Sequence, residues 1–213
     1  MDDVVIIGGG IIGTATAYFL SKEGRKVKVI ERDPTYKTAS FPLSLGGFRR
    51  QFFQKENILL GKFARDFIFK IPEVLKTEKN PNPTASMVTN GYLLMFGPEH
   101  AEEQYRALEN HKECDAGTKN IKGSELSNVF SYINNDGIET ATYTDNQSEG
   151  WIDPFMFHGA LKSKAIELGA EFIKGEVKSI SEIKANTIIS AAGCWTKKLL
   201  DDIPVVPQKH TVF

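Results

Sequence analysis

The stretch VVIIGGGIIG, Val4 to Gly13, decides the fold of this chain. Its first four residues are β-branched and predict a buried strand, and the apolar residues after the glycines recur at helical spacing up to Gly24, a natural helix terminator. Acidic residues precede the run and four glycines interrupt it, so it is typical of neither a signal peptide nor a membrane span. The pattern predicts a strand that turns sharply into a helix.

The glycines at this junction have the G-x-G-x-x-G spacing, with Gly8, Gly10 and Gly13 as its members. A helix that starts there leaves its first N–H groups unpaired, and these attract a phosphate. Gly8 permits the turn, Gly10 lets a pyrophosphate approach the backbone, and Gly13 lets the helix pack on the sheet. A second strand, Val27 to Ile30, ends at Glu31, whose carboxylate can accept both hydroxyls of an adenosine ribose. A plain glycine-rich turn is the alternative, but the order of these elements favours a dinucleotide site.

The segment after this acid bears on which dinucleotide is bound. A plain NAD domain continues with a second helix and a third strand, whereas Arg32 to Phe52 shows no apolar period. It contains Ser40, Ser44, Gly46 and Gly47. Such a loop leaves the carboxyl end of a parallel strand, where these folds bind ligands, and a glycine pair lets backbone lie against a flat ring or a phosphate. This favours the longer cofactor FAD over NAD, with an NAD-dependent dehydrogenase as the alternative.

Several segments together resemble the amine- and amino-acid-oxidising flavoproteins of the D-amino-acid oxidase type, which include sarcosine, dimethylglycine and glycine oxidases. These segments are VVIIGGGIIG, VIERDPTYKTAS, LSLGGFRRQF, GWIDP and TIISAAGCW. ERDPTY, the S-x-G-G-x-R-x-Q-F pattern from Ser44 to Phe52, NILL and EGWIDP resemble one mitochondrial branch, which is associated with assembly of respiratory complex I. The resemblance runs the length of the chain and covers about the first half of the family's fold.

The resemblance implies an α/β fold in which a Rossmann-like FAD-binding βαβ domain carries part of a mixed-sheet substrate domain, a truncated glutathione-reductase-type flavoprotein fold. We expect the FAD domain at residues 1–79 and 151–213 and the partial substrate domain at 80–150. The glycine loop lacks the His or Cys that tethers flavin in some relatives, so FAD is expected to bind non-covalently.

The resemblance also implies a set of FAD contacts. The glycines of the G-x-G-x-x-G motif are expected to contact the pyrophosphate, and Glu31 the adenosine ribose. Arg32 and the backbone of Val177 are expected to contact the adenine, and the serines and glycines of the loop after Arg32 the pyrophosphate and flavin. The residues 191–193 are expected to cover the nucleotide. The whole set is Gly8, Gly10, Gly13, Glu31, Arg32, Ser40, Ser44, Gly46, Gly47, Val177, Ala191, Ala192 and Gly193.

The implied function is oxidation of the C–N bond of an amine or amino acid, in which flavin accepts a hydride from the C–H beside the nitrogen. Arg49 follows the glycine pair and suits a substrate carboxylate, although a solvated surface arginine fits equally well. The alternative is a flavin-binding assembly factor for mitochondrial respiratory complex I without small-molecule turnover. The chain stops at Phe213, where the family's substrate sheet continues, so we expect a truncated form that is inactive alone. A mitochondrial location is implied, and no transit peptide is visible.

Composition sets further bounds. Lys plus Arg is 26 and Asp plus Glu is 27, so nothing indicates a nucleic-acid face, and small molecules or proteins are the expected partners. Cys114 and Cys194 are far apart and outside any C-x-x-C, which favours a reducing compartment. The four histidines form no ligand pair at helical or hairpin spacing, so no metal site is predicted.

The remaining pattern predicts a helix whose apolar stripe, Leu59, Phe63, Phe67 and Ile71, is expected in the core, with Pro72 kinking or ending it. A second helix is expected from Pro154, capped by Asp153, to Gly169. Further helices are expected after residues 98 and 124, and strands at 92–96, 137–144, 171–174, 176–180 and 186–190. Cys194 and Trp195 are expected to be packing residues.

Overall fold

The computed structural model describes residues 2–144, 148–209 and 211, and these form two compact units. Unit 1 comprises Met1–Gly46, Ile71–Ser86 and Asp153–Phe213. Unit 2 comprises Gly47–Lys70 and Met87–Ile152. The main difference from the expected domain bounds is the segment Gly47–Lys70, which groups with unit 2 and not with unit 1.

Unit 1 is built on a four-stranded parallel sheet of order β8-β2-β1-β9. Its strands are β1 (Asp2–Ile7), β2 (Val27–Glu31), β8 (Glu171–Lys174) and β9 (Ala185–Ser190). The central strand β1 is paired on both edges, and Val4 to Ile7 are each at most 5% exposed. A strand covered on both faces reads as a continuous apolar run, which is why the opening stretch lacks polar alternation. The predicted βαβ unit is confirmed.

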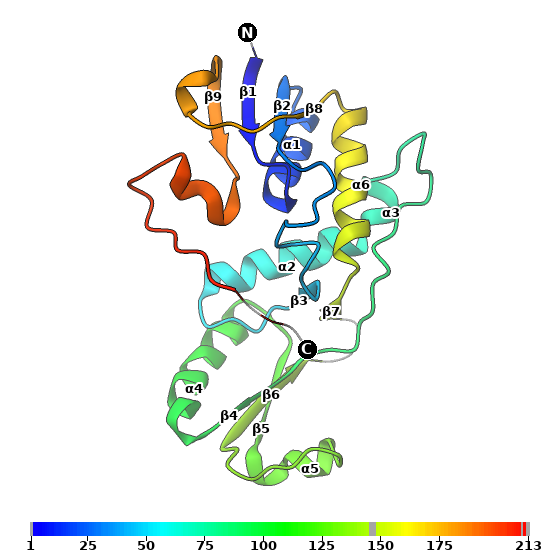
Figure 1. Cartoon of the computed structure of the whole chain (residues 1–213). Helices are drawn as coiled ribbons and strands as arrows, with labels where there is room; N and C mark the ends of the chain where they lie inside the picture. Colours follow the sequence, from blue (N-terminus) through cyan, green and yellow to red (C-terminus); the bar gives the residue numbers. More distant parts are fainter. Residues whose placement is uncertain (1, 145–147, 210, 212–213) are drawn as a thin grey trace. The chain divides into compact units, whose positions relative to one another are not determined.

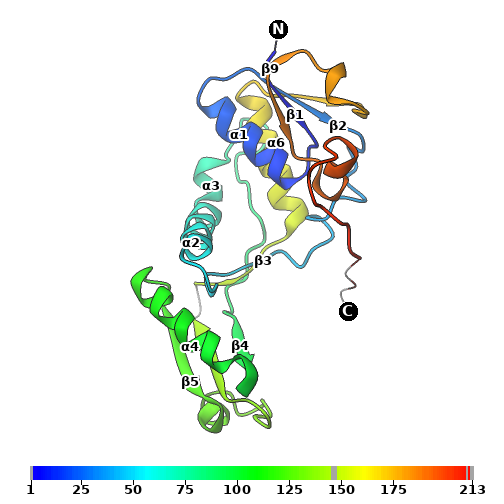
Figure 2. The ribbon, with the colours of Figure 1, turned by 90° about the vertical axis from the view of Figure 1, so that its left-hand side faces the viewer.

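Two helices, α1 (Ile11–Lys22) and α6 (Pro154–Glu167), pack against each other beside this sheet (Figures 1 and 2). The predicted bounds of α6 are confirmed: the Asp153 carboxylate accepts the Met156 N–H at 2.9 Å, and the left-handed Gly169 (φ 100°) follows the helix. The strand expected at 176–180 is wrong. The segment after β8 joins no sheet and leads into the short 3-10 helix η2 (Ile180–Glu182).

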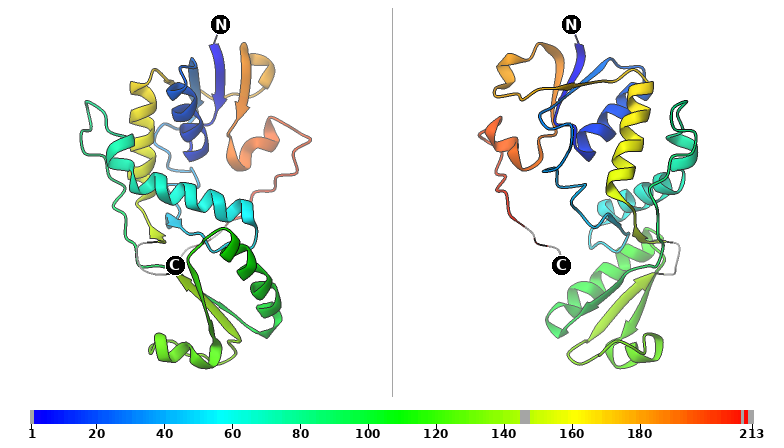
Figure 3. Two further views of the ribbon diagram at one scale, coloured as in Figure 1. Left: turned by 180° about the vertical axis from the view of Figure 1, so that it is seen from behind. Right: turned by 45° about the vertical axis from the view of Figure 1, so that its right-hand side comes forward.

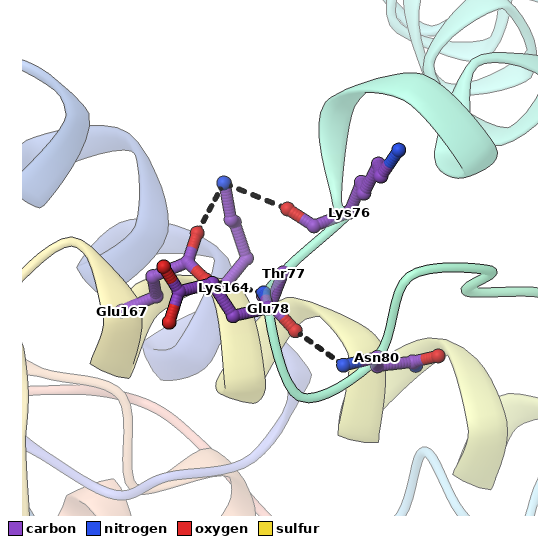
Figure 4. Close-up of polar contacts among 6 residues, drawn as sticks. All are labelled: Lys76, Thr77, Glu78, Asn80, Lys164 and Glu167. Carbon is purple, nitrogen blue, oxygen red and sulfur yellow. Dashed lines mark hydrogen bonds and ion pairs between the residues drawn. The ribbon is translucent and has the colours of Figure 1, made fainter.

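The loop that follows α3 (residues 71–74) is fastened to α6 (Figure 4). Lys164 Nζ donates to a main-chain carbonyl of this loop at 2.8 Å and to Glu167 Oε1 at 2.6 Å. Glu167 Oε2 accepts the Glu78 N–H at 2.9 Å, and Thr77 and Asn80 close the turn with reciprocal hydrogen bonds. The hydrogen bond from Lys164 lowers the pKa of Glu167, so this carboxylate stays ionised when it binds the loop.

Unit 2 holds an antiparallel sheet of order β4-β6-β5, with α4 covering one face (Figure 3). A separate antiparallel pair of strands, β3 and β7, connects the start of the segment Gly47–Lys70 to the end of the segment Met87–Ile152. The elements are β3 (Gly47–Phe48), α2 (Lys55–Phe69), β4 (Leu93–Phe96), α4 (Pro98–Glu113), β5 (Thr118–Lys122), η1 (Gly123–Glu125), α5 (Leu126–Val129), β6 (Thr140–Thr144) and β7 (Gly150–Trp151). The predicted strands near 92–96 and 137–144 and the helices after 98 and 124 are confirmed; β3, β5 and β7 were not predicted.

The expected core stripe is only partly confirmed. Ile71 is buried as predicted, but Leu59 and Phe63 are 54% and 58% exposed. The buried residues of α2 are instead Ile58 and Ile68. Ile58 packs in a cluster with the turn that follows α4, which fixes the inward face of the helix. Because α2 carries apolar residues on more than one face, its periodicity could not say which face packs. The helix does end before Pro72, as predicted.

Within residues 2–144, 148–209 and 211, no helix combines the length and hydropathy of a membrane-spanning segment.

Candidate functional site

The turn between β1 and α1, Gly8–Gly10, is called the glycine turn below. Gly8 has φ 101°, and a Cβ built on it would lie 2.5 Å from the carbonyl oxygen of Ala191. A Cβ on Gly13 would lie 1.9 Å from the carbonyl oxygen of Gly8. Only glycine fits either position. At Gly10, the N-cap of α1, a Cβ would meet no atom within 4 Å, so this position faces open space.

That open space is a cavity of about 360 Å³ in unit 1. Its walls come from the glycine turn and from the segments that leave the carboxyl ends of β2, β8 and β9. The chain passes from β1 to β2 on one side of the sheet centre and reaches β9 on the other, so the cavity lies where the strand order reverses. Open parallel sheets bind ligands at this position.

Nine of the expected FAD contacts line this cavity. They are Gly8, Gly10, Glu31, Arg32, Ser40, Val177, Ala191, Ala192 and Gly193. Gly13 lies behind the glycine turn, where its missing side chain lets α1 approach Gly8. Ser44 and Gly46 are outside the lining and form a turn of their own, in which the Ser44 hydroxyl accepts the Gly46 N–H at 3.2 Å. Gly47 and Arg49 belong to unit 2.

The Glu31 carboxylate is held in place by two main-chain donors. Oε2 accepts the Gly9 N–H at 2.6 Å, and Oε1 accepts the Asp33 N–H at 2.8 Å. A carboxylate oxygen can accept more than one hydrogen bond, so each oxygen keeps capacity for a ligand hydroxyl. The acid at the end of β2 is therefore oriented by the protein itself.

A planar wall stands beside this acid. The Arg32 guanidinium carbon lies 3.9 Å from the centroid of the Trp195 ring, and both residues line the cavity. Trp195 lies in the 3-10 helix η3 (Gly193–Lys198), which begins at the last of the three small residues after β9. We expected Trp195 only as a packing residue; its stacked cation makes a flat surface that suits a heteroaromatic ring.

Tyr36 and Lys162 form a second pair that the sequence reasoning missed. Lys162 Nζ donates to the Tyr36 hydroxyl at 2.9 Å, and Tyr36 lines the cavity. Burial, with help from the negative charges of Glu31 and Asp33, raises the pKa of Tyr36 to about 12. Burial lowers the pKa of Lys162, and the charge of Glu31 opposes that shift.

Thr14 and His158 lie on the inner side of the glycine turn and were also missed. His158 Nε2 is 2.8 Å from the Gly9 carbonyl oxygen and 3.0 Å from Thr14 Oγ1. Burial lowers the pKa of the His158 imidazole below its usual 6.5, and the hydrogen bond to Gly9 opposes this shift less strongly. His158 is therefore neutral at pH 7. No signal in the sequence indicated the contact between Thr14 and His158, because the two residues lie 144 positions apart.

Unit 2 has its own cavity of about 250 Å³, which includes Arg49 and Gln51 in its lining. The Arg49 guanidinium carbon lies 4.7 Å from the centroid of the Phe52 ring. The fully buried Glu149 carboxylate accepts the main-chain N–H groups of Arg50 and Gln51, the Gln51 side-chain N–H at 2.8 Å, and a threonine hydroxyl at 2.8 Å. These bonds tie the RRQ segment to the EGW segment, and so fix the backbone that carries Arg49.

Comparison with known proteins shows the family of this chain. The model of the family described as FAD dependent oxidoreductase matches residues 3–213. FAD-dependent oxidoreductase domain-containing protein 1 of Xenopus laevis is 38% identical over 267 residues, covering 99% of this chain and 53% of that protein. Mitochondrial dimethylglycine dehydrogenase of Rattus norvegicus is 27% identical, and the match covers 98% of this chain and 26% of that protein.

Among solved structures, L-proline dehydrogenase from P. horikoshii superposes with a TM-score of 0.73 at 25% identity, covering 93% of this chain and 54% of that chain. The chain spans about half the length of the first of these relatives and of this structure. The open Gly10 position, the oriented acid and the flat wall fit the FAD that this family uses. The chain belongs to the FAD dependent oxidoreductase family.

Proposed function

We propose that this chain carries the FAD-binding part of an oxidoreductase that acts on the C–N bond of an amine or amino acid. The observation that supports it most directly is the glycine turn, whose Gly10 position opens into a cavity at the reversal of strand order with the Glu31 carboxylate already oriented beside it. In this proposal unit 1 is the FAD-binding domain, and unit 2 is part of the substrate domain.

The proposed residue roles follow from this geometry. The N-terminus of α1 and the glycine turn bind the pyrophosphate, because unpaired N–H groups and the helix dipole favour an anion there. Glu31 accepts the hydroxyls of the adenosine ribose, and the Arg32–Trp195 wall lies beside the adenine with the backbone of Val177. We retain Ser40 and the loop residues 44, 46 and 47 as contacts of the pyrophosphate and the flavin.

For the substrate we propose an amino acid with a substituted nitrogen. Dimethylglycine and proline, which name two of the similar proteins, share a carboxylate and an N-alkyl group. Bound FAD supplies the two-electron acceptor. Arg49 is the proposed carboxylate contact, because its guanidinium lies over an aromatic ring at a cavity and its backbone is fixed by the buried Glu149. The protein's contribution is to orient the substrate and to exclude water.

The test is a titration of the purified chain with FAD and, separately, with NAD, followed by flavin fluorescence and by the visible spectrum. We expect a yellow protein that binds FAD and does not bind NAD. Binding of NAD with no affinity for FAD would refute the proposal in favour of a nicotinamide-dependent enzyme.

The alternative, a flavin-binding assembly factor for mitochondrial respiratory complex I, stays a prediction from the sequence resemblance. A form that spans the full length of the relatives separates the two functions. Anaerobic mixing of that form with dimethylglycine, sarcosine, proline and D-amino acids should bleach the flavin if the protein is an oxidoreductase. A flavin that none of them reduces, in a protein that captures complex I subunits, would favour the assembly factor.

A further inference from the structure

We infer that Thr14 and His158 are positioning residues of the FAD site, which together orient the Gly9 carbonyl and through it the pyrophosphate-binding side of the glycine turn. This inference rests on the proposed FAD site in unit 1. The two residues are called the Gly9 donor pair below. Neither was singled out by the sequence motifs, and neither lines the cavity.

Both members of the pair reach the same oxygen. Thr14 Oγ1 donates to the Gly9 carbonyl oxygen at 2.8 Å, and His158 Nε2 lies 2.8 Å from that oxygen. A carbonyl oxygen can only accept, so Nε2 carries the proton and the neutral ring is the Nε2–H tautomer. Thr14 is fully buried and His158 is 3% exposed, so water does not compete for this oxygen.

The orientation of this carbonyl sets the direction of the next N–H group. The Gly9 carbonyl and the Gly10 N–H belong to one planar trans peptide, in which they point in opposite directions. Holding the carbonyl on the inner side therefore aims the Gly10 N–H outward, on the side where the Gly10 position is open. The preceding peptide is fixed separately, because its Gly9 N–H donates to Glu31 Oε2 at 2.6 Å.

The glycine turn needs such external support. Glycine has no Cβ to restrict its backbone, so a run of three glycines has many accessible conformations and gains little rigidity from its own residues. Two side chains from α1 and α6 supply that rigidity before the cofactor binds. Preorganised donors bind more tightly, since less ordering remains to be done on binding.

The inference also gives a role to the EGWIDP motif, which lies far from the glycine turn in sequence. Asp153 caps α6, and His158 follows five residues later, 149 residues from Gly9. The His158 ring is held at the edge of Tyr36, with 4.3 Å between ring centroids and an interplanar angle of 71°. The start of α6 thus fixes where the imidazole lies.

The experiment compares three variants of the full 213-residue chain. His158→Phe removes the donor and keeps a ring, His158→Gln keeps an N–H donor, and His111→Phe is the matched control. His111 is also 3% exposed, and its Nε2 lies 2.7 Å from the Phe52 carbonyl oxygen in unit 2. The measurements are the dissociation constants for FAD, ADP and adenosine by calorimetry, and the melting temperature.

We expect His158→Phe to raise the dissociation constants of FAD and ADP, which carry the pyrophosphate, by about tenfold. The dissociation constant of adenosine should rise by less than about twofold. His158→Gln should restore FAD affinity to within about threefold. His111→Phe should lower the melting temperature without changing either affinity. If His158→Phe does not fold, Thr14→Val tests the other donor and should weaken FAD by about fivefold.

The inference is overturned if His158→Phe binds FAD as tightly as the wild type does, or if its affinities for adenosine and FAD fall by the same factor. It is also overturned if His111→Phe lowers the FAD affinity as much as His158→Phe does. Thr14→Val with unchanged FAD affinity has the same meaning. A wild-type chain that binds neither FAD nor ADP refutes the proposed function itself, which is a different result.

Discussion

Replacing Gly10 by alanine adds one methyl group at the N-cap of α1, on the open side of the glycine turn. The backbone there has φ −63° and ψ −173°, which any residue adopts, and the new Cβ would meet no atom within 4 Å. We therefore expect a loss of less than about 1 kcal/mol in the free energy of unfolding, as for a changed N-cap. In the FAD complex the same methyl group would occupy space that the pyrophosphate needs. Overpacking by one methyl group costs about 1–3 kcal/mol, so the FAD dissociation constant should rise about fivefold to 150-fold.

The assay is a fluorescence titration with FAD alongside scanning calorimetry of the unliganded protein. Gly13→Ala is the contrasting variant, because its Cβ would lie 1.9 Å from the Gly8 carbonyl oxygen and 3.2 Å from Ile6 Cγ2. It should destabilise the unliganded fold by about 1–3 kcal/mol or more. A folded Gly10→Ala variant with wild-type FAD affinity would show that the pyrophosphate does not approach Gly10, and the reasoning would fail.

Three other perturbations test the site and its support. Glu31→Gln offers one oxygen to two main-chain N–H donors, so the FAD dissociation constant should rise about tenfold and the melting temperature should fall; an unchanged constant would remove Glu31 from the site. Burial lowers the pKa of both His111 and His158, so the unfolded chain binds more protons than the folded one below pH 6.5, and stability should fall as the pH drops from 7 toward 5. Melting temperatures across this range should show the fall, and replacing both histidines by glutamine should reduce it; a wild-type melting temperature that does not change would contradict both shifts. Glu149→Leu leaves several buried donors of unit 2 unpaired and should cost roughly 3 kcal/mol in urea unfolding; a loss under about 1 kcal/mol would show that water or other groups replace the carboxylate.

Features that depend on neighbours in sequence were predicted well. The strand, glycine turn and helix from Val4 to Lys22 follow from apolar period and glycine spacing. The cap at Asp153 and the left-handed Gly169 likewise bounded α6. In each case the residues that decide the conformation lie within a turn or two of one another, so local sterics and hydrogen bonding suffice.

The predicted FAD contacts were only partly brought together. Nine of them line one cavity, because they follow the carboxyl ends of parallel strands, and a parallel sheet places those ends at one edge. Ser44 and Gly46 lie outside the lining, and Gly47 falls in the other unit, as does Arg49, the predicted substrate contact. A loop without periodic structure gives no information about where its backbone runs, so those positions could not be predicted.

The sequence by itself determined the βαβ start, the glycine turn and the acid at the end of β2, since each has a local steric or hydrogen-bonding cause. Tertiary structure decided which face of α2 is buried, that Trp195 stacks on Arg32, and that His158 reaches Gly9 across 149 residues. Periodicity shows which side chains are able to face a core. It does not show which surface they meet, because that depends on the register at which distant helices pack.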